Sequence, residues 1–268
     1  MIAFIGVAHP FSLSNKTALV VGASRGIGLS IANQLAQAGA RVILAARSMD
    51  KLEKIAEGFR AQGYSAVAVH LDLMDTNSIR NCIESLSHID ILVNVSGTNV
   101  RKAFADFTTE EYERILQTNL HGLVTLTQLV GKRMIARGNG GKIINIGSLM
   151  SLLGLPYLTI YAITKSALAG LTRTLAAEWG RYNIQVNCIA PGFILTDLNR
   201  TMWQEGAMHD WLMGAQPNPK MGTPEDVAPL AVFLSSHGAD YITGQVIAVD
   251  GGYSTTAKWP FEPPPAVE

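Results

Sequence analysis

The sequence predicts an α/β fold in a single domain, a doubly wound sheet of about seven parallel strands with helices on both faces. Three observations support this prediction. Short β-branched runs alternate with longer amphipathic stretches, a glycine-rich turn follows the first run, and no linker or internal repeat divides the 268 residues. With 48% hydrophobic residues, the chain can also supply a large core and at least one subunit interface.

The expected strands are continuous apolar runs, which are typical of a parallel sheet covered on both faces. In chain order they are TALVVGA, RVILAAR, AVAVHL, DILVNVS, KIINIGS, IQVNCIAPG and GQVIAVDGG. The amphipathic stretches between them include 28–38, 50–62, 109–137 and 161–182. We expect Thr109 to cap the third of these stretches, because Glu110 and Glu111 follow it as favourable first-turn charges.

The charge balance argues against polyanionic partners. The chain has 21 basic and 21 acidic residues and a formal net charge of zero, so we expect neither nucleic acid nor a membrane as partner. The apolar start, MIAFIGVAHPFSL, lacks the features of a signal peptide and is too short to span a bilayer. Two cysteines, Cys82 and Cys188, are expected to be buried thiols of a reducing compartment, so we predict a cytoplasmic protein without a metal site.

The glycine-rich turn predicts a dinucleotide-binding site of the Rossmann type. In VVGASRGIG the glycines Gly22, Gly26 and Gly28 stand between the first strand and the first helix, with Ser24, Arg25 and Ile27 among them. Glycines permit a tight turn and let the backbone approach a pyrophosphate at the helix N-terminus.

The end of the second strand indicates which dinucleotide binds. An NAD site usually has an acidic residue about twenty positions after the glycines, but here Ala46 takes that place and Arg47 follows. Arginine can bind a 2′-phosphate through two donors, and Arg25 approaches the same place from the glycine turn. We therefore expect NADP(H), with two solvated arginines as the alternative.

Two further strand ends complete the expected nucleotide site. Asp72, next to Leu73, ends the third strand, and its carboxylate is positioned to accept from the adenine amino group. Asn94 ends the fourth strand, where ligands of open α/β sheets bind, and Gly97 follows it. Either polar residue can instead be a simple turn residue.

Taken together, these motifs resemble the short-chain dehydrogenase/reductase family in its branch of about 250 residues. The resemblance rests on the glycine turn, the Asn-x-x-Gly at 94–97, Asn119, Ser148, Tyr161 with Lys165, and PGFILT, in the family's order over residues 13–253. Within the family, the chain most resembles members like gluconate 5-dehydrogenase, on the stretch GTNVRKAFADFTTEEY. It also resembles members like 3-oxoacyl-ACP reductase. The resemblance implies one catalytic, dinucleotide-binding domain over 1–268.

The expected chemistry is hydride transfer between NADP(H) and a carbonyl or secondary alcohol. Tyr161 and Lys165 stand at i and i+4 on one helix face, and Ser148 lies thirteen positions before Tyr161. A free tyrosine titrates near ~10, and a lysine charge near the phenol favours the phenolate. Tyr161 is thus the expected general acid and base, and Ser148 the hydrogen-bond donor to the developing alkoxide.

The family resemblance implies the remaining roles near the nicotinamide. By the family's pattern Lys165 also holds the nicotinamide ribose, and Asn119 supports a water-linked proton relay to it; a local helix irregularity is the alternative for Asn119. The matching loop beside the carboxamide contains Pro191, Gly192, Ile194 and Thr196. Thr196 can equally cap the following helix.

Substrate specificity is expected in residues 195–221, a Met- and Trp-rich substrate lid, with an ordinary amphipathic helix as the alternative. The tentative substrate contacts are Arg101, Leu155, Tyr157, Met202 and Trp203. Arg101 with Lys102 suits an anionic or polyhydroxylated substrate, unless the two are a solvated surface pair. The proline-rich tail, 254–268, is expected to be extended and to reach a neighbouring subunit.

The remaining alternatives concern assembly and reaction class. The family commonly forms tetramers through the helices near 109–137 and 161–182, so a homotetramer is expected, with a homodimer as the alternative. Besides the NADPH-dependent enzyme, the sequence leaves open an NAD-dependent sugar-acid or alcohol dehydrogenase and a non-catalytic NADP-binding sensor.

Overall fold

A seven-stranded parallel sheet forms the centre of the molecule, as the sequence predicts. The computed structural model describes residues 10–95, 97–197, 199–203 and 205–255. The strands are β1 Thr17–Val21, β2 Arg41–Ala46, β3 Ala66–His70, β4 Ile91–Asn94, β5 Gly141–Ile146, β6 Ile184–Pro191 and β7 Val246–Val249. Their order is β3-β2-β1-β4-β5-β6-β7, so the winding reverses between β1 and β4, where open α/β sheets form a ligand crevice at the carboxyl ends of the strands.

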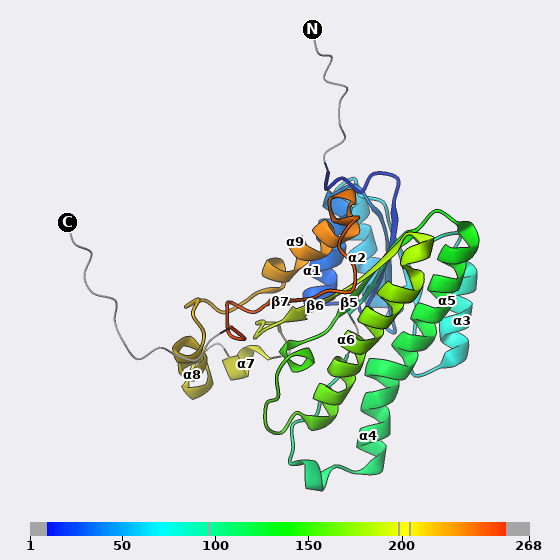
Figure 1. The fold of residues 1–268 in the computed structure, drawn as a ribbon. Helices are drawn as coiled ribbons and strands as arrows, with labels where there is room; N and C mark the ends of the chain where they lie inside the picture. The colour runs from blue at the N-terminus through cyan, green and yellow to red at the C-terminus, as the bar shows by residue number, and fades with distance from the viewer. Residues whose placement is uncertain (1–9, 96, 198, 204, 256–268) are drawn as a thin grey trace, which may run out of the picture.

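Helices cover both faces of the sheet (Figure 1). On one face lie α1 Gly26–Gln37, α2 Met49–Ala61 and α9 Pro224–Ser235, and on the other α3 Thr76–Ser85, α4 Thr109–Leu116, α5 Gly122–Arg137 and α6 Thr159–Trp179. Each layer has its own apolar cluster against the sheet, one containing Ile31, Leu52 and Val227, the other Ile79, Leu126 and Leu168. Strand residues point alternately into the two clusters, which explains why the strands are apolar throughout.

The helix predicted over 109–137 begins one residue earlier than expected at its cap. Thr108, not Thr109, is the N-cap: its Oγ1 accepts from the Glu111 amide at 3.2 Å, and the Glu111 carboxylate accepts from the Thr108 amide at 3.1 Å. The prediction for Thr109 is wrong because this reciprocal pair requires a Thr-x-x-Glu spacing, which only Thr108 provides. The stretch is also not uniform, since a π-helical turn, Gln117–His121, separates α4 from α5.

The predicted lid region folds into two short helices rather than one. These are α7 Arg200–Trp203 and α8 Ala207–Ala215, which lie apart from the two helical layers in Figure 1. Gly206 stands directly before α8 with a φ of 86°, a backbone conformation that favours glycine. The tail from residue 256 onwards and its expected extended conformation lie outside the described residues.

Two expectations about the chain's surroundings can be compared with the fold. Cys82 and Cys188 are buried and unpaired, as predicted, and burial raises the pKa of both thiols, that of Cys82 to about 11. Among the described residues, none of the helices has the length and hydropathy that a membrane crossing needs. The same described part of the chain holds no cluster of three or more potential metal ligands.

Candidate active site

The glycine turn after β1 is shaped to receive an anion. Gly22 and Gly26 have φ values of 85° and 53°, and a Cβ at Gly28 would collide with the Gly22 carbonyl oxygen. The N-terminus of α1 has no side-chain cap at Arg25 and no acidic residue in its first turn. Its amide groups are therefore left to an external acceptor, which fits the pyrophosphate of a dinucleotide.

The residues expected at the adenosine part of the cofactor lie in the glycine turn and after β2 and β3. Arg25 and Arg47 are exposed, and the arginine ion pairs among the described residues involve Arg60, Arg137 and Arg200 instead. Ala46 closes β2 without an acidic group, so nothing at this position opposes a 2′-phosphate. The Asp72 Oδ1 accepts from the Met74 amide at 2.9 Å, and the Leu73 carbonyl accepts from Gln117 at 3.2 Å, which fixes the turn after β3.

The Asn94 side chain points into the protein rather than toward a ligand. Its Nδ2 donates to Thr127 Oγ1 and to Asn145 Oδ1, both at 2.9 Å, and the side chain is fully buried. Asn145 in turn donates to Thr172 Oγ1 at 2.9 Å, so a polar ladder joins β4, β5 and α6 inside the sheet. The Asn94 Oδ1 is buried and has no hydrogen-bond partner among the described residues, and the cofactor contact of Asn94 stays a prediction.

Asn119 lies in the π-helical turn and holds the loop that follows β4. Its Oδ1 accepts from the Thr98 amide at 2.7 Å, and its Nδ2 donates to the Thr98 carbonyl at 2.8 Å and to Thr164 Oγ1 at 3.3 Å. A π turn inside an α-helix frequently marks a functional position. The helix irregularity that the sequence left open is present here, and the role of Asn119 in a proton relay stays a prediction.

Ser148, Tyr161 and Lys165 come together where β5 leads into α6. Lys165 is buried, its Nζ donates to the Ile146 carbonyl at 2.8 Å and lies 5.6 Å from the ring centroid of Tyr161. A Cβ at Gly97 would lie 3.5 Å from this Nζ and 3.6 Å from Asn119 Oδ1, so the loop after β4 passes beside the ammonium. The Ser148 Oγ accepts from the Met150 amide at 3.2 Å, which leaves its own proton to donate.

The turn that contains Ser148 is fastened to α6. Ser151 Oγ donates to the Lys165 carbonyl at 2.9 Å, and Ser166 Oγ donates to the Met150 carbonyl at 3.0 Å. Leu149 and Met150 pack with Leu158 in a small cluster that Tyr161 and Leu155 join. Serine, tyrosine and lysine are thus fixed relative to one another by apolar packing and by hydrogen bonds from serine side chains to main-chain carbonyls.

The loop after β6 reaches back to the glycine turn. A Cβ at Gly26 would lie 3.5 Å from Thr196 Cγ2, so the two predicted cofactor loops approach each other closely. Gly192 packs against the main chain of Asp250, and Ile194 pairs with Gly222 in an isolated bridge. Thr196 does not cap a helix, because α7 starts at Arg200 and the Thr196 amide and hydroxyl lie on Asn199 Oδ1 at 2.8 and 3.3 Å.

Aromatic side chains form one side of the site, and the sequence pointed to only part of them. The Phe193 ring lies 5.0 Å from Trp203, 5.8 Å from Trp211 and 5.1 Å from Tyr253, measured between centroids. The Arg101 guanidinium lies 5.7 Å from the Trp203 ring centroid, which joins the predicted basic and apolar contacts. Tyr157 is exposed with a φ of 65°, Leu155 packs beside Tyr161, and the Met202 side chain lies outside the described structure.

Phe193 and Tyr253 are residues that sequence reasoning did not single out. Phe193 stands inside the recognised PGFILT loop, and its central place in the aromatic cluster shows only in three dimensions. The ion pair between Lys102 and Glu111 also shows only in three dimensions; its nitrogen and oxygen are 2.8 Å apart.

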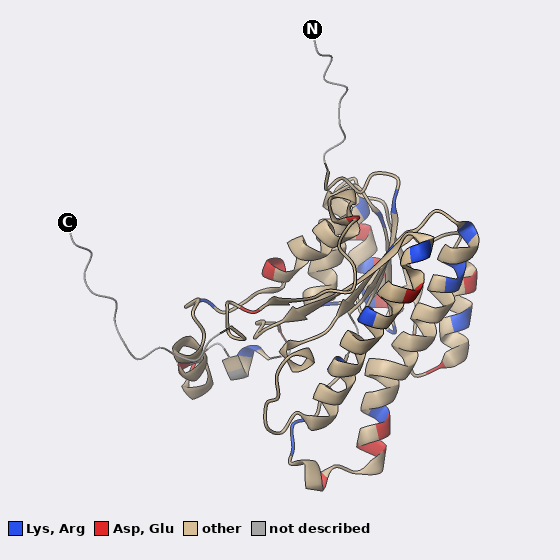
Figure 2. Ribbon diagram, in the orientation of Figure 1, with Lys and Arg blue, Asp and Glu red and all other residues tan. Residues whose placement is uncertain are grey.

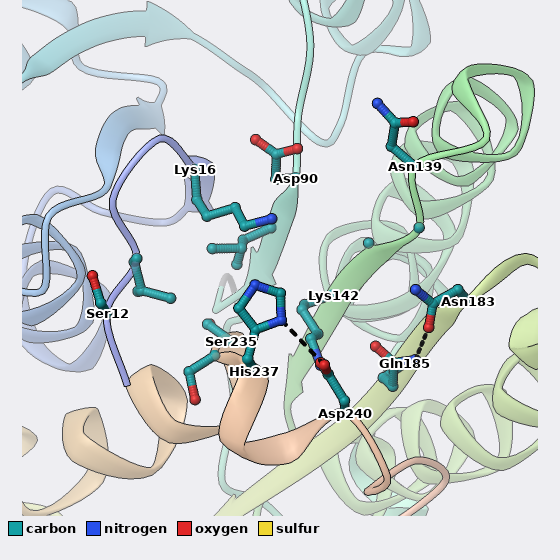
Figure 3. Close-up of a pocket in the computed structure, with 15 residues that line it drawn as sticks. Ser12, Lys16, Asp90, Asn139, Lys142, Asn183, Gln185, Ser235, His237 and Asp240 are labelled. Carbon is teal, nitrogen blue, oxygen red and sulfur yellow. Dashed lines mark hydrogen bonds and ion pairs between the residues drawn. The ribbon is translucent and has the colours of Figure 1, made fainter. Parts of the chain in front are cut away.

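A polar pocket of about 60 Å³ lies at the opposite edge of the sheet (Figure 3). There Lys142 Nζ lies 2.6 Å from Asp240 Oδ1, and the other oxygen of Asp240 lies 3.1 Å from His237 Nδ1. Asp90 pairs with Arg137 at 2.8 Å and accepts from the Thr17 amide. The acidic groups in this pocket are paired within the protein, and it contains none of the predicted site residues.

Comparisons with known proteins identify the family of the chain. Residues 22–254 match a family model described as Enoyl-(Acyl carrier protein) reductase. The chain is 36% identical over 256 residues to gluconate 5-dehydrogenase of Gluconobacter oxydans, covering 93% of this chain and 100% of the relative. It is 39% identical over 245 residues to 3-oxoacyl-(acyl-carrier-protein) reductase of Pseudomonas aeruginosa, covering 90% and 98% respectively.

Solved structures match equally well. A gluconate 5-dehydrogenase from Burkholderia cenocepacia, in complex with NADP and tartrate, has a TM-score of 0.89 and 37% identity, covering 92% of this chain and 98% of the other. Two further similar structures also contain bound NADP. Since the family model spans most of the chain and these relatives span nearly all of it, the chain belongs to the short-chain dehydrogenase/reductase family and is an oxidoreductase.

Proposed function

We propose that the protein is an NADP(H)-dependent oxidoreductase that transfers a hydride between the nicotinamide and a carbonyl or secondary alcohol group. One observation supports this most: the Lys165 ammonium is buried beside the Tyr161 ring at the carboxyl end of β5, where Ser148 also lies. A phenol, a hydroxyl and a buried ammonium in one place suit proton transfer to an oxygen that is becoming an alkoxide.

Tyr161 is the general acid and base in this proposal. The bound cofactor supplies or receives the hydride, while the Tyr161 phenol donates a proton to the carbonyl oxygen and takes it back in the oxidative direction. The nearby Lys165 charge favours the phenolate, and Ser148 donates its free proton to the same oxygen.

Lys165 and Asn119 complete the proposed proton path. The Asn119 side chain is already bonded to Thr98 and Thr164, so we assign the water link toward Lys165 to its main-chain carbonyl. A π turn changes the pairing of local carbonyl groups, which suits that assignment. Lys165 also holds the nicotinamide ribose, and the loop of Pro191, Gly192, Ile194 and Thr196 borders the carboxamide.

The choice of NADP(H) over NAD(H) rests on the end of β2. Ala46 presents no carboxylate to a 2′-phosphate, and the Arg47 and Arg25 guanidinium groups are unpaired within the described part of the chain. Similar proteins with bound NADP support the same choice.

For the substrate we propose a polyhydroxylated acid, with Arg101 binding its carboxylate. Relatives named for gluconate support this class, and the second class, a 3-oxoacyl thioester, is supported by the reductase of Pseudomonas aeruginosa and by the aromatic cluster around Phe193. Leu155, Tyr157 and the 195–221 lid with Trp203 form the proposed remainder of the substrate pocket.

A screen of ketones, keto-acids, sugar acids and 3-oxoacyl thioesters with NADPH and NADH, followed by nicotinamide absorbance, tests these proposals together. We expect turnover with NADPH and with at least one polyhydroxylated keto-acid. Turnover with NADH alone would overturn the cofactor assignment. Tight NADPH binding without turnover of any compound would favour the non-catalytic sensor.

We also propose assembly as a homotetramer in the cytoplasm, with a homodimer as the alternative. The first halves of α5 and α6 have few charged side chains (Figure 2), and Val124 and Ile163 are exposed there. Such a surface suits burial against a second copy. Sedimentation of the full chain distinguishes monomer, dimer and tetramer.

A further inference from the structure

The loop between β4 and α4 contacts both the π turn that contains Asn119 and the lid helix α7. At its start, Asn119 bonds to both the amide and the carbonyl of Thr98. Three residues later, the Arg101 guanidinium lies 5.7 Å from the ring centroid of Trp203 on α7. The loop therefore joins a proposed catalytic residue to a proposed substrate contact over a short length of chain.

Lys102 fastens this loop to the N-terminus of α4. Its Nζ lies 2.8 Å from Glu111 Oε2, and each side chain of the pair is less than a third exposed. The same oxygen accepts from the Thr108 amide at 3.1 Å, so the carboxylate is itself held by the helix cap. The lysine ammonium also lies 5.6 Å from the Phe107 ring centroid. These contacts make the pair more constrained than an isolated surface ion pair.

The main chain of Lys102 reaches a second element of the substrate side. Its amide donates to the Tyr157 carbonyl at 3.3 Å. Tyr157 has a φ of 65°, a left-handed conformation that non-glycine residues adopt rarely and that surrounding contacts must maintain. The segment before Tyr161 is therefore tied to the same lysine that Glu111 holds.

We propose that Lys102 and Glu111 are positioning residues for substrate recognition. Their ion pair fixes the loop so that Arg101 on one side and Tyr157 on the other keep their orientation toward an anionic carbonyl substrate. Neither member of the pair touches the substrate. This inference rests on the proposed function and assigns to it a specificity device outside the substrate pocket.

The test compares Glu111→Gln with Glu110→Gln in the full-length protein. Each variant removes one negative charge from the first turn of α4, but Glu110 has no ion-pair partner in the described structure. With 5-keto-D-gluconate as substrate, we expect Glu111→Gln to raise KM about fivefold, with kcat and the Kd for NADPH unchanged. Glu110→Gln should match the native enzyme in all three quantities. Lys102→Met should reproduce the effect, and Lys102→Met/Glu111→Gln should add nothing further.

Equal KM values for the two glutamine variants would overturn the inference. So would a weaker affinity for NADPH in Glu111→Gln, because that result indicates general damage to the fold. If the native protein binds NADPH but reduces neither 5-keto-D-gluconate nor any other polyhydroxylated keto-acid of the screen, the proposed substrate class fails and the inference falls with it. Turnover by the native protein with no difference between the variants removes the positioning role alone.

Discussion

The charged groups at the two ends of the parallel strands are paired differently. We call the end at which the strands begin the amino edge and the end at which they finish the carboxyl edge. At the amino edge, Lys142 pairs with Asp240 and Arg137 pairs with Asp90, at 2.6 and 2.8 Å. At the carboxyl edge, Arg47 has no ion-pair partner in the described part of the chain, and the α1 N-terminus has no cap. The amino edge therefore pairs these charges within the protein, whereas the carboxyl edge leaves the Arg47 guanidinium and the first amides of α1 to a ligand. The same strands therefore carry stabilising ion pairs at one end and the proposed ligand-binding groups at the other.

The largest expected effect breaks the chemistry at the carboxyl edge. Tyr161→Phe removes the phenolic proton and keeps the ring that packs near Leu158. General acid–base catalysis contributes about 10²- to 10⁴-fold, so we expect kcat to fall by about that factor. NADPH titration by fluorescence should give the native Kd. A variant that retains kcat would exclude Tyr161 as the acid.

Arg47→Asp tests the carboxyl edge at the cofactor. Replacing the guanidinium by a carboxylate should weaken NADPH binding by about 10- to 100-fold, because a charge-assisted pair to the 2′-phosphate is lost and a repulsion replaces it. Arg41, exposed at the amino end of the same strand, provides a matched control. Arg41→Asp makes the same charge change at the other edge and should leave both Kd values, for NADPH and NADH, unchanged. Equal effects of the two variants would show that overall charge, not a site, governs binding.

The smallest expected effect concerns the amino edge. Burial opposes ionisation of Asp240, but hydrogen bonds from Lys142 and His237 outweigh it and hold its pKa below the ordinary value. A carboxyl with a depressed folded pKa stabilises the fold above its unfolded pKa, and this contribution is lost as pH falls through the folded value. The Asp240 side chain is 53% exposed, so solvent screens the pair, and Asp240→Asn should lower the free energy of unfolding at pH 7 by at most about 1 kcal/mol.

Urea denaturation at pH 7 and at about pH 3.5, below the ordinary carboxyl pKa, measures this contribution. The difference between native and variant protein should shrink at the lower pH, while kcat/KM at pH 7 stays the same. A loss of activity without a loss of stability would show that the amino edge takes part in function.

Features that depend on residues close together in the sequence were predictable. The seven strands, the glycine turn and the spacing of Ser148, Tyr161 and Lys165 depend on neighbours along the chain, and each lies where the pattern indicated. Contacts between distant segments were not predictable. The buried ladder at Asn94 and the ring of aromatics around Phe193 depend on how strands and loops meet in space.

The helix cap shows the same limit on a smaller scale. Thr108 and Thr109 are chemically identical neighbours, and both precede acidic residues. Only the three-residue spacing to Glu111 distinguishes them, and the same glutamate also pairs with Lys102. Composition indicates where a helix starts, whereas the reciprocal hydrogen bonds decide the residue.

The π turn at Gln117–His121 has a consequence for insertions and deletions. It holds one residue more than an α-helical path of the same length, so everything after it is rotated by about 100° relative to α4. The buried face of α5, with Leu123, Leu126 and Val130, is built on that rotation. Deleting one residue from the turn would give a more regular helix but turn this face away from the sheet. Asn119 therefore occupies a position where substitution is a local change, while a single deletion misaligns an entire helix.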